Sequence, residues 1–541
     1  MTNKITRYFY RALAIILGIV FLAFLIHNGL LLGRLYSGPY FKPFFWTYLF
    51  FFILYSFIFV KIYRWNNELK IIFTIFVLAA LPRLLLVFIN FEFYQPTSDF
   101  LNYLRFGQLM LSGNYEELAN LIAIYRIPTM GGLAVYNGLI AFLFSPTLLG
   151  FQISNVITTS LICVFIYQIG KGINRKVALS ATMFFTLYLS NIVASQITNN
   201  QHPSVLYVLI SMFFLKKLID SDKKHMSLIH IILSTIFMGI ASFMHASALV
   251  FFIAYMAFAG AVFFASLNMD SLKSLFSFKR HVKEKSYSMQ KKMLLFLCIF
   301  LIGYIMIPQA GLQLMYRRGV INSLETHPFL QHFVIGLDVD GRGCFTGNPS
   351  FQRLRSYPYD ERQAMAAQII REQLQDPVGI TKLIIHKLNR AYFGGDTHFL
   401  WYVHYQHSQY RENLLTEDEI DSYYHMFRIK NGVREVDRLT VHFLFLFAAM
   451  GLLLRKHIKL DDMYYLQIIV VLGMFLVIAL VESQPRYRYP AMPSLAILAS
   501  AGLFEAIRLG DFAKVKAYSL FTNSIDKINQ NKKRLKKSND K

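Results

Sequence analysis

Long apolar stretches alternate with short polar connections along most of this chain. We count about twelve such stretches, each about 17–23 residues long, and a helix needs about 20 apolar residues to cross a bilayer core. They cover residues 12–33, 44–63, 70–90, 149–170, 177–196, 203–219, 227–245, 247–267, 293–314, 438–454, 462–481 and 489–507. The pattern therefore predicts an all-α, polytopic membrane protein.

Two longer polar segments, 91–148 and 315–436, interrupt this pattern. Helical periodicity covers residues 359–376, and Pro377 is expected to begin a second amphipathic helix that runs through Phe393. The apolar stretch 129–146 lies inside the first polar segment and contains glycines and Asn137. We expect it to lie at the interface or to re-enter the membrane, because that composition suits a packed position away from lipid.

The lysines and arginines predict the orientation. Cytoplasmic loops of membrane proteins carry an excess of these residues. With the N-terminus inside, the basic stretches 171–176, 273–292 and 508–541 all face the cytoplasm, and both long polar segments lie outside. If 129–146 spanned the membrane, every later loop would invert. The net charge of +24 is thus an orientation signal and an attraction to anionic membrane lipids, and no nucleic-acid partner is expected.

Composition agrees with a membrane protein, since 55% of the residues are hydrophobic, 16% are charged and the mean hydropathy is +0.41. The three cysteines, Cys163, Cys298 and Cys344, form neither a disulfide framework nor a metal-binding spacing. The expected parts are N-terminal transmembrane helices (1–90), an extracytoplasmic catalytic loop with an interfacial helix (91–148), a transmembrane core (149–314), a large extracytoplasmic loop domain (315–436), C-terminal transmembrane helices (437–510) and a basic cytoplasmic tail (511–541).

Asp99 is the first candidate for chemistry. It stands in the string YQPTSDFLNYLRFG, just outside the third apolar stretch. A carboxylate there suits a general base or a metal ligand at the membrane surface. The alternative is a structural one, in which Ser98 or Asp99 caps a helix that starts at Phe100.

The second candidate cluster is VESQPRYRYPAMP, residues 481–493, which holds Glu482, Arg486 and Arg488. Two arginines at the outer mouth of the last spans depart from the charge rule. The planar guanidinium matches phosphate oxygens bidentately, so a lipid phosphate is one explanation. Anchoring to lipid headgroups, with neighbouring tyrosines in the aromatic belt, is the other.

Further polar residues lie at expected outer ends of spans. The uncharged turn SQITNNQHPS presents Asn199, Gln201 and His202, which either bind sugar hydroxyls or form a plain turn. His245 interrupts an apolar run and is either a structural histidine or a substrate contact. Arg126, before the interfacial stretch, is a further candidate for anion contact.

One more arginine, Arg83, lies within the third apolar stretch. Because an arginine in the membrane is costly, we expect it to face the bundle interior. The sequence contains no Walker loop, dinucleotide fingerprint, zinc-protease helix or serine elbow. An activated substrate of this protein is therefore not expected to be a nucleotide.

Taken together, the strings SDFLNY and GNY in an early outer loop, the apolar interfacial stretch, and ESQPRYRYPAMP near the end resemble the GT-C superfamily of membrane glycosyltransferases. The likeness covers residues 70–510 and is nearest to the bacterial protein O-mannosyltransferases and the lipid A aminoarabinose transferase. It implies a GT-C-like bundle and transfer of a sugar from a polyprenyl-phosphate donor to an extracytoplasmic acceptor in the cell envelope, such as a glycan, wall polymer, lipid or protein.

The resemblance also implies roles for residues. Asp99 corresponds to the family's loop acid and Arg486 to its arginine before the last span. Tyr103 and Glu482 are then expected near the substrate. One base and one anion clamp suggest displacement with inversion. No metal ligands are assigned, and a divalent cation is left open as a cofactor, since Phe100 stands where many relatives carry a second acid.

Two other classes handle the same lipids. A transporter or flippase of lipid-linked sugars would also use outer and intramembrane arginines, but inverted repeats and broken mid-membrane helices are not evident. A polysaccharide polymerase or ligase would share the lipid-linked substrates and would not need the early aspartate loop.

The predicted topology can be tested by cysteine labelling in a chain whose own cysteines are replaced. An impermeant thiol reagent applied to intact cells should label a cysteine placed at Gln352, in the outer segment, and should not label one at Lys285, in the basic run. The opposite labelling pattern would overturn the assignment of both long segments.

Overall fold

The structure is a computed structural model, and it describes thirteen stretches of the chain. These are residues 11–23, 25–26, 41–90, 98–125, 129–221, 223–266, 284–322, 330–344, 347–358, 360–393, 417–455, 463–482 and 484–511. Within these stretches the regular structure is entirely helical, with no strand. The all-α prediction is confirmed.

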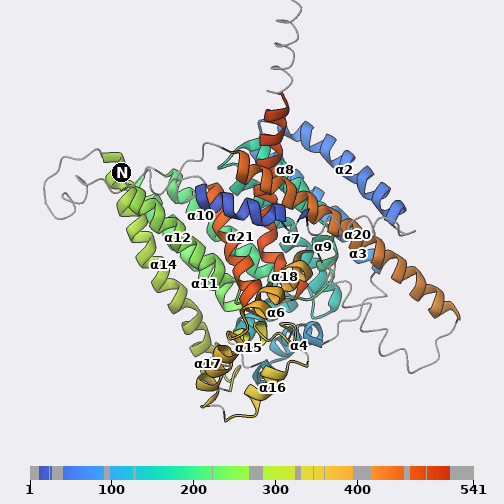
Figure 1. Ribbon diagram of the computed structural model, residues 1–541, viewed down its shortest axis with the longest axis vertical. Coiled ribbons are helices and arrows are strands. Elements are labelled where there is room, and N and C mark those ends of the chain that lie inside the picture. Colours follow the sequence, from blue (N-terminus) through green and yellow to red (C-terminus); the bar gives the residue numbers. More distant parts are fainter. Residues whose placement is uncertain are drawn as a thin grey trace, which may run out of the picture.

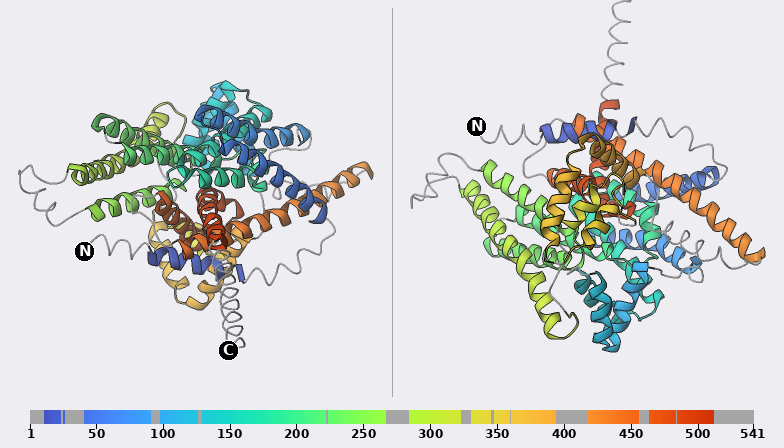
Figure 2. Two further views of the ribbon diagram at one scale, coloured as in Figure 1. Left: turned by 90° about the horizontal axis from the view of Figure 1, so that it is seen from above. Right: turned by 60° about the horizontal axis from the view of Figure 1, so that its bottom comes forward.

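Long helices form the body of the molecule (Figures 1 and 2). They are α2 (Phe41–Tyr63), α3 (Glu68–Asn90), α7 (Leu148–Gly170), α10 (Gln201–Asp220), α11 (Lys224–Met244), α12 (Ala248–Ser266), α14 (Glu284–Arg317), α20 (Glu417–Leu454), α21 (Met463–Leu480) and a last helical span, Arg486–Asp511. Of the described helices, 10 are long and apolar enough to cross a membrane. The protein is therefore built as a multi-pass membrane protein.

Two of the expected spans differ from the helices that the structure shows. The stretch 177–196 is not one helix but two short ones, α8 (Arg175–Thr186) and α9 (Leu189–Ala194). The break gives polar groups of this stretch tertiary partners: Arg83 Nη1 lies 3.5 Å from the carbonyl oxygen of Thr186, and Ser190 contacts α20. Of the stretch 12–33, the structure describes only the short apolar helix Arg11–Ala23 and residues 25–26.

The stretch 129–146 forms α6 (Thr129–Leu143), which has 15 residues and falls short of a bilayer crossing. It packs against α4 (Ser98–Ser112), where Asn137 Nδ2 donates to the carbonyl oxygen of Tyr103 at 2.7 Å. A Cβ added at Gly132 would lie 1.9 Å from the carbonyl oxygen of Phe243, so only glycine lets α11 approach this closely. The expected packed helix is thus present, and its glycines serve close contacts.

Apart from the start of α20, which extends to the right in Figure 1, the helices of both long polar segments gather toward the bottom of the bundle in this view. The first segment contributes α4, α5 (Tyr115–Tyr125) and α6. The second contributes α15 (Gln331–Gly336), α16 (Pro349–Arg355), α17 (Arg362–Gln373) and α18 (Pro377–Phe393). The predicted helix from Pro377 through Phe393 is confirmed at both ends, whereas α20 begins at Glu417, well before the expected 438.

We expect Gly132→Ala to destabilise the fold by about 1–3 kcal/mol, because the added methyl group meets a backbone carbonyl that cannot move freely. Gly260→Ala in α12 is the matched control, since a Cβ there meets no atom within 4 Å. Thermal unfolding of both variants in detergent measures the difference. Equal melting temperatures would show that α6 does not need this close approach.

Candidate functional site

Asp99 and Arg486 lie together although 387 positions separate them in the chain. Asp99 is the second residue of α4, and Arg486 belongs to the short helix η1 (Pro485–Ala491). Arg486 Nη2 lies 3.5 Å from Asp99 Oδ2, and the two side chains keep 21% and 36% of their exposure. The contact is long and partly open, so both groups remain accessible to a ligand.

A tyrosine holds the other oxygen of the Asp99 carboxylate. The hydroxyl of Tyr125 donates to Asp99 Oδ1 at 3.2 Å, and Asn102 Nδ2 donates to that hydroxyl at 2.8 Å. Burial is the main reason that the pKa of Tyr125 rises to about 12, so the phenol stays a donor. α4 begins at Ser98, so Asp99 lies inside its first turn and not before a helix that starts at Phe100. The Asp99 carboxylate contacts the side chains of Tyr125 and Arg486.

Aromatic rings surround the Arg486 guanidinium. The rings of Phe100 and Tyr487 each lie 5.7 Å from its central carbon, within the range of cation–π attraction. Tyr103, one turn along α4 from Phe100, is buried, and burial raises the pKa of its phenol. Arg486 Nε is buried and has no hydrogen-bond partner among the described residues. The guanidinium is therefore positioned and still has donor capacity to offer.

Two further charged residues, Glu482 and Lys387, lie in the neighbourhood of Arg486. Glu482 is buried, and burial raises its pKa despite the nearby Arg486 charge, while Gln484 Nε2 donates to its Oε1 at 2.6 Å. Lys387 in α18 donates to the carbonyl oxygens of Gly336, Ala479 and Val481 at 2.7, 2.9 and 2.6 Å. Burial lowers the pKa of Lys387 to about 7. This lysine fixes the chain that leads into η1.

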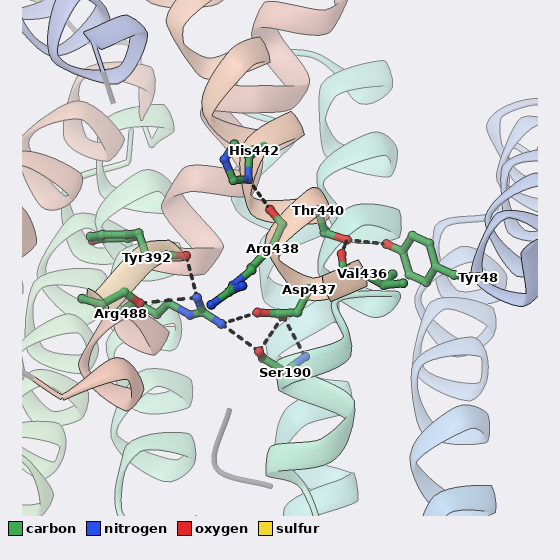
Figure 3. A network of polar contacts seen from close by, with 10 residues as sticks. Tyr48, Ser190, Tyr392, Val436, Asp437, Arg438, Thr440, His442 and Arg488 are labelled. Atoms are coloured by element: carbon green, nitrogen blue, oxygen red, sulfur yellow. Dashed lines mark hydrogen bonds and ion pairs between the residues drawn. The ribbon is translucent and has the colours of Figure 1, made fainter. Parts of the chain in front are cut away.

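Arg488 has a different environment from Arg486 (Figure 3). Its Nη2 lies 2.5 Å from Asp437 Oδ2, and both side chains are almost fully buried, at 3% and 0% exposure. Nη2 also lies 2.9 Å from Ser190 Oγ, which bonds Asp437 Oδ1 at 2.5 Å. Nη1 donates to the carbonyl oxygen of Tyr392 at 2.7 Å. The Arg488 guanidinium is therefore committed to joining η1, α9, α18 and α20.

The uncharged turn SQITNNQHPS, residues 195–204, contacts α4. Asn199 Oδ1 accepts from the backbone N–H groups of Gln201 and His202 at 3.0 and 3.1 Å, which covers the start of α10. Both of these side chains are buried, and the His202 ring lies 4.7 Å from that of Tyr489. Thr198 Oγ1 donates to the carbonyl oxygen of Phe100 at 2.6 Å. The turn thus supports the helix that carries Asp99.

The remaining candidate residues, His245, Arg83 and Arg126, have different positions. His245 lies at the end of α11 and has the Arg486 charge nearby. Arg83 is fully buried in the bundle, and its Nη1 donates to the carbonyl oxygen of Ala79 at 2.5 Å. Arg126 lies outside the described residues. Within the described stretches, no three His, Cys, Asp or Glu residues gather in a way that could hold a metal ion.

Three residues of this region were missed by sequence reasoning. Asp437 lies one position before the expected span 438–454, whereas the candidate span of the structure starts at Gly432, so the assumed boundary hid its buried position. Lys387 carried an interpretable signal, because it is a lysine within an amphipathic helix. Tyr125 had none, since its role depends on how α5 packs against α4.

Comparison with known protein families finds no family that matches this chain, and comparison with curated proteins finds no matching relative. The functional interpretation consequently depends on the site itself.

We expect Asp437→Ala to destabilise the protein by about 3–5 kcal/mol, because it leaves the Arg488 charge buried without its partner. Adding Arg488→Met to that variant should recover part of the loss. Glu372→Gln, which breaks the exposed Arg353–Glu372 pair, is the control and should leave the melting temperature unchanged. An Asp437→Ala variant as stable as the parent would contradict the structural role assigned to Arg488.

Proposed function

We propose that this protein is a membrane glycosyltransferase that moves a sugar from a polyprenyl-phosphate-linked donor to an acceptor outside the cytoplasm. The observation that carries the proposal is the meeting of Asp99 and Arg486, a carboxylate and a guanidinium from distant segments, in a partly open position. The sequence resemblance to GT-C glycosyltransferases assigns a role to the same two residues.

The chemistry needs one base and one anion clamp. The acceptor hydroxyl oxygen attacks the anomeric carbon, and its proton passes to the Asp99 carboxylate, which Tyr125 orients. The bond from that carbon to the phosphate oxygen breaks, and polyprenyl phosphate leaves with the electron pair. Arg486 stabilises the negative charge on the leaving phosphate. Attack opposite the leaving group inverts the configuration of the sugar.

Arg486 suits this role better than Arg488. Its contact with Asp99 is long, and its Nε has no partner in the described part of the chain, so a phosphate can gain hydrogen bonds without breaking a buried ion pair. Donor binding must then separate Arg486 from Asp99, which leaves the carboxylate free to accept a proton. Arg488, in contrast, would have to leave Asp437 at high cost.

The surroundings suit a lipid donor. α6 packs against α4 and keeps Leu139, Phe142 and Leu143 exposed, at 51%, 73% and 58%. Such an apolar surface, on the helix that packs against α4, can accommodate the polyprenyl chain while the phosphate reaches Arg486. We assign the site to the extracytoplasmic face of the cell membrane, because the lysine and arginine distribution places both long segments there.

Asp99→Asn should lower turnover at least about 10²-fold, because the amide cannot take the acceptor's proton. The measurement is release of undecaprenyl phosphate from a panel of undecaprenyl-phosphate hexoses by the purified protein in nanodiscs. Asp340→Asn is the matched control, since Asp340 is an exposed acid on the second long segment. Turnover near the parent's rate in the Asp99 variant would remove this residue from the mechanism and favour transport.

Arg486→Ala should weaken use of the donor by about 1.5–3 kcal/mol, the range for a hydrogen bond to a charged group. Arg486→Lys should recover only part, because a point charge replaces a planar fork. Arg371→Ala, at an exposed position in α17, is the control. If all three variants have the parent's donor kinetics, Arg486 is a membrane anchor and not a clamp.

A further inference from the structure

His245 lies where helices that carry the site converge. It ends α11, two residues after Phe243, whose carbonyl oxygen approaches Gly132 of α6. Five residues later, Val250 packs in one apolar cluster with Ala491, the last residue of η1. His245 therefore lies in the chain between a residue that contacts α6 and one that packs with η1, and the Arg486 charge contributes to lowering its pKa.

The turn after His245 decides which ring nitrogen carries the proton. The backbone N–H of Ser247 donates to His245 Nδ1 at 3.1 Å, and Ser247 Oγ lies 2.8 Å from the same nitrogen. Nδ1 must therefore keep its lone pair. Burial, together with the Arg486 charge, lowers the pKa of His245 to about 4, so the ring is neutral near pH 7. A neutral ring with Nδ1 as acceptor carries its hydrogen on Nε2.

Nε2 is thereby restricted to donating a hydrogen bond. It cannot act as a general base or bind a metal while the Ser247 bond to Nδ1 persists. It also cannot bond to Arg486, since a guanidinium has no acceptor atom. The hydrogen bonds of the His245 ring to described residues are made at Nδ1, and Arg486 Nε is buried without a partner in the described part of the chain. An anionic ligand at Arg486 can accept from the unpartnered Arg486 Nε and from the donor at His245 Nε2, because the Arg486 charge acts on the His245 ring.

We infer that His245 is a second phosphate-binding residue, which donates from Nε2 to the anion that Arg486 holds. The identity of the anion as a polyprenyl phosphate rests on the proposed function. A neutral donor strengthens binding without adding a charge, and this matters because the phosphate must be released after transfer. Ser247 acts as a positioning residue through its backbone N–H.

Amide substitutions separate the two ring nitrogens. Glutamine can place its N–H₂ near the position of Nε2, whereas asparagine reaches only the position of Nδ1. The dissociation constant of undecaprenyl phosphate is measured for the purified parent, His245→Gln and His245→Asn in nanodiscs, with undecaprenol as the uncharged probe. Glu372→Gln, an exposed change far along the chain, controls for preparation.

His245→Gln should stay within about 3-fold of the parent, and His245→Asn should bind undecaprenyl phosphate at least about 10-fold more weakly, with undecaprenol binding unchanged. Equal loss in both variants, no loss in either, or loss in the glutamine variant alone would each overturn the role of Nε2. If the parent itself does not prefer undecaprenyl phosphate to undecaprenol, the proposed function fails along with this inference.

Discussion

The buried ion pair between Arg488 and Asp437 is the interaction on which the geometry of this site depends. Arg488 stands two residues after Arg486 on the same short helix, and Asp437 fixes it to α20. Ser190 of α9 and the carbonyl oxygen of Tyr392 in α18 complete the set of contacts. A buried charge is tolerated only when paired and hydrogen-bonded. η1 is therefore held in one position, and Arg486 is presented toward Asp99.

The requirement that a buried charge be paired also explains why Arg486 and Arg488, two positions apart, have different environments. Arg488 uses its hydrogen-bonding capacity inside the protein and stabilises the junction of four elements. The Arg486 guanidinium contacts the rings of Phe100 and Tyr487, and its ion pair with Asp99 is long, at 3.5 Å. An electrostatic clamp works best when its donors are positioned beforehand. In the proposed mechanism, the buried pair supplies that preorganisation, and Arg486 supplies the charge.

Much of the fold followed from hydrophobic length alone. Ten expected spans correspond to helices that can cross a membrane, and the start of α18 followed from Pro377. The break between α8 and α9 did not follow, because Thr186 and Ser190 gain partners from α3 and α20 that are distant in sequence. For the same reason, local patterns singled out Asp99 and Arg486 separately, but their contact, the Tyr125 bond and the Asp437 partner depend on tertiary packing.

The most direct test is an experimental structure of the protein in nanodiscs with undecaprenyl phosphate bound. We expect the phosphate to lie within about 2.7–3.2 Å of the Arg486 guanidinium, the contact between Arg486 and Asp99 to be opened, and the Arg488–Asp437 pair to be unchanged. A phosphate bound away from Arg486, or bound by Arg488 with the buried pair broken, would contradict the account.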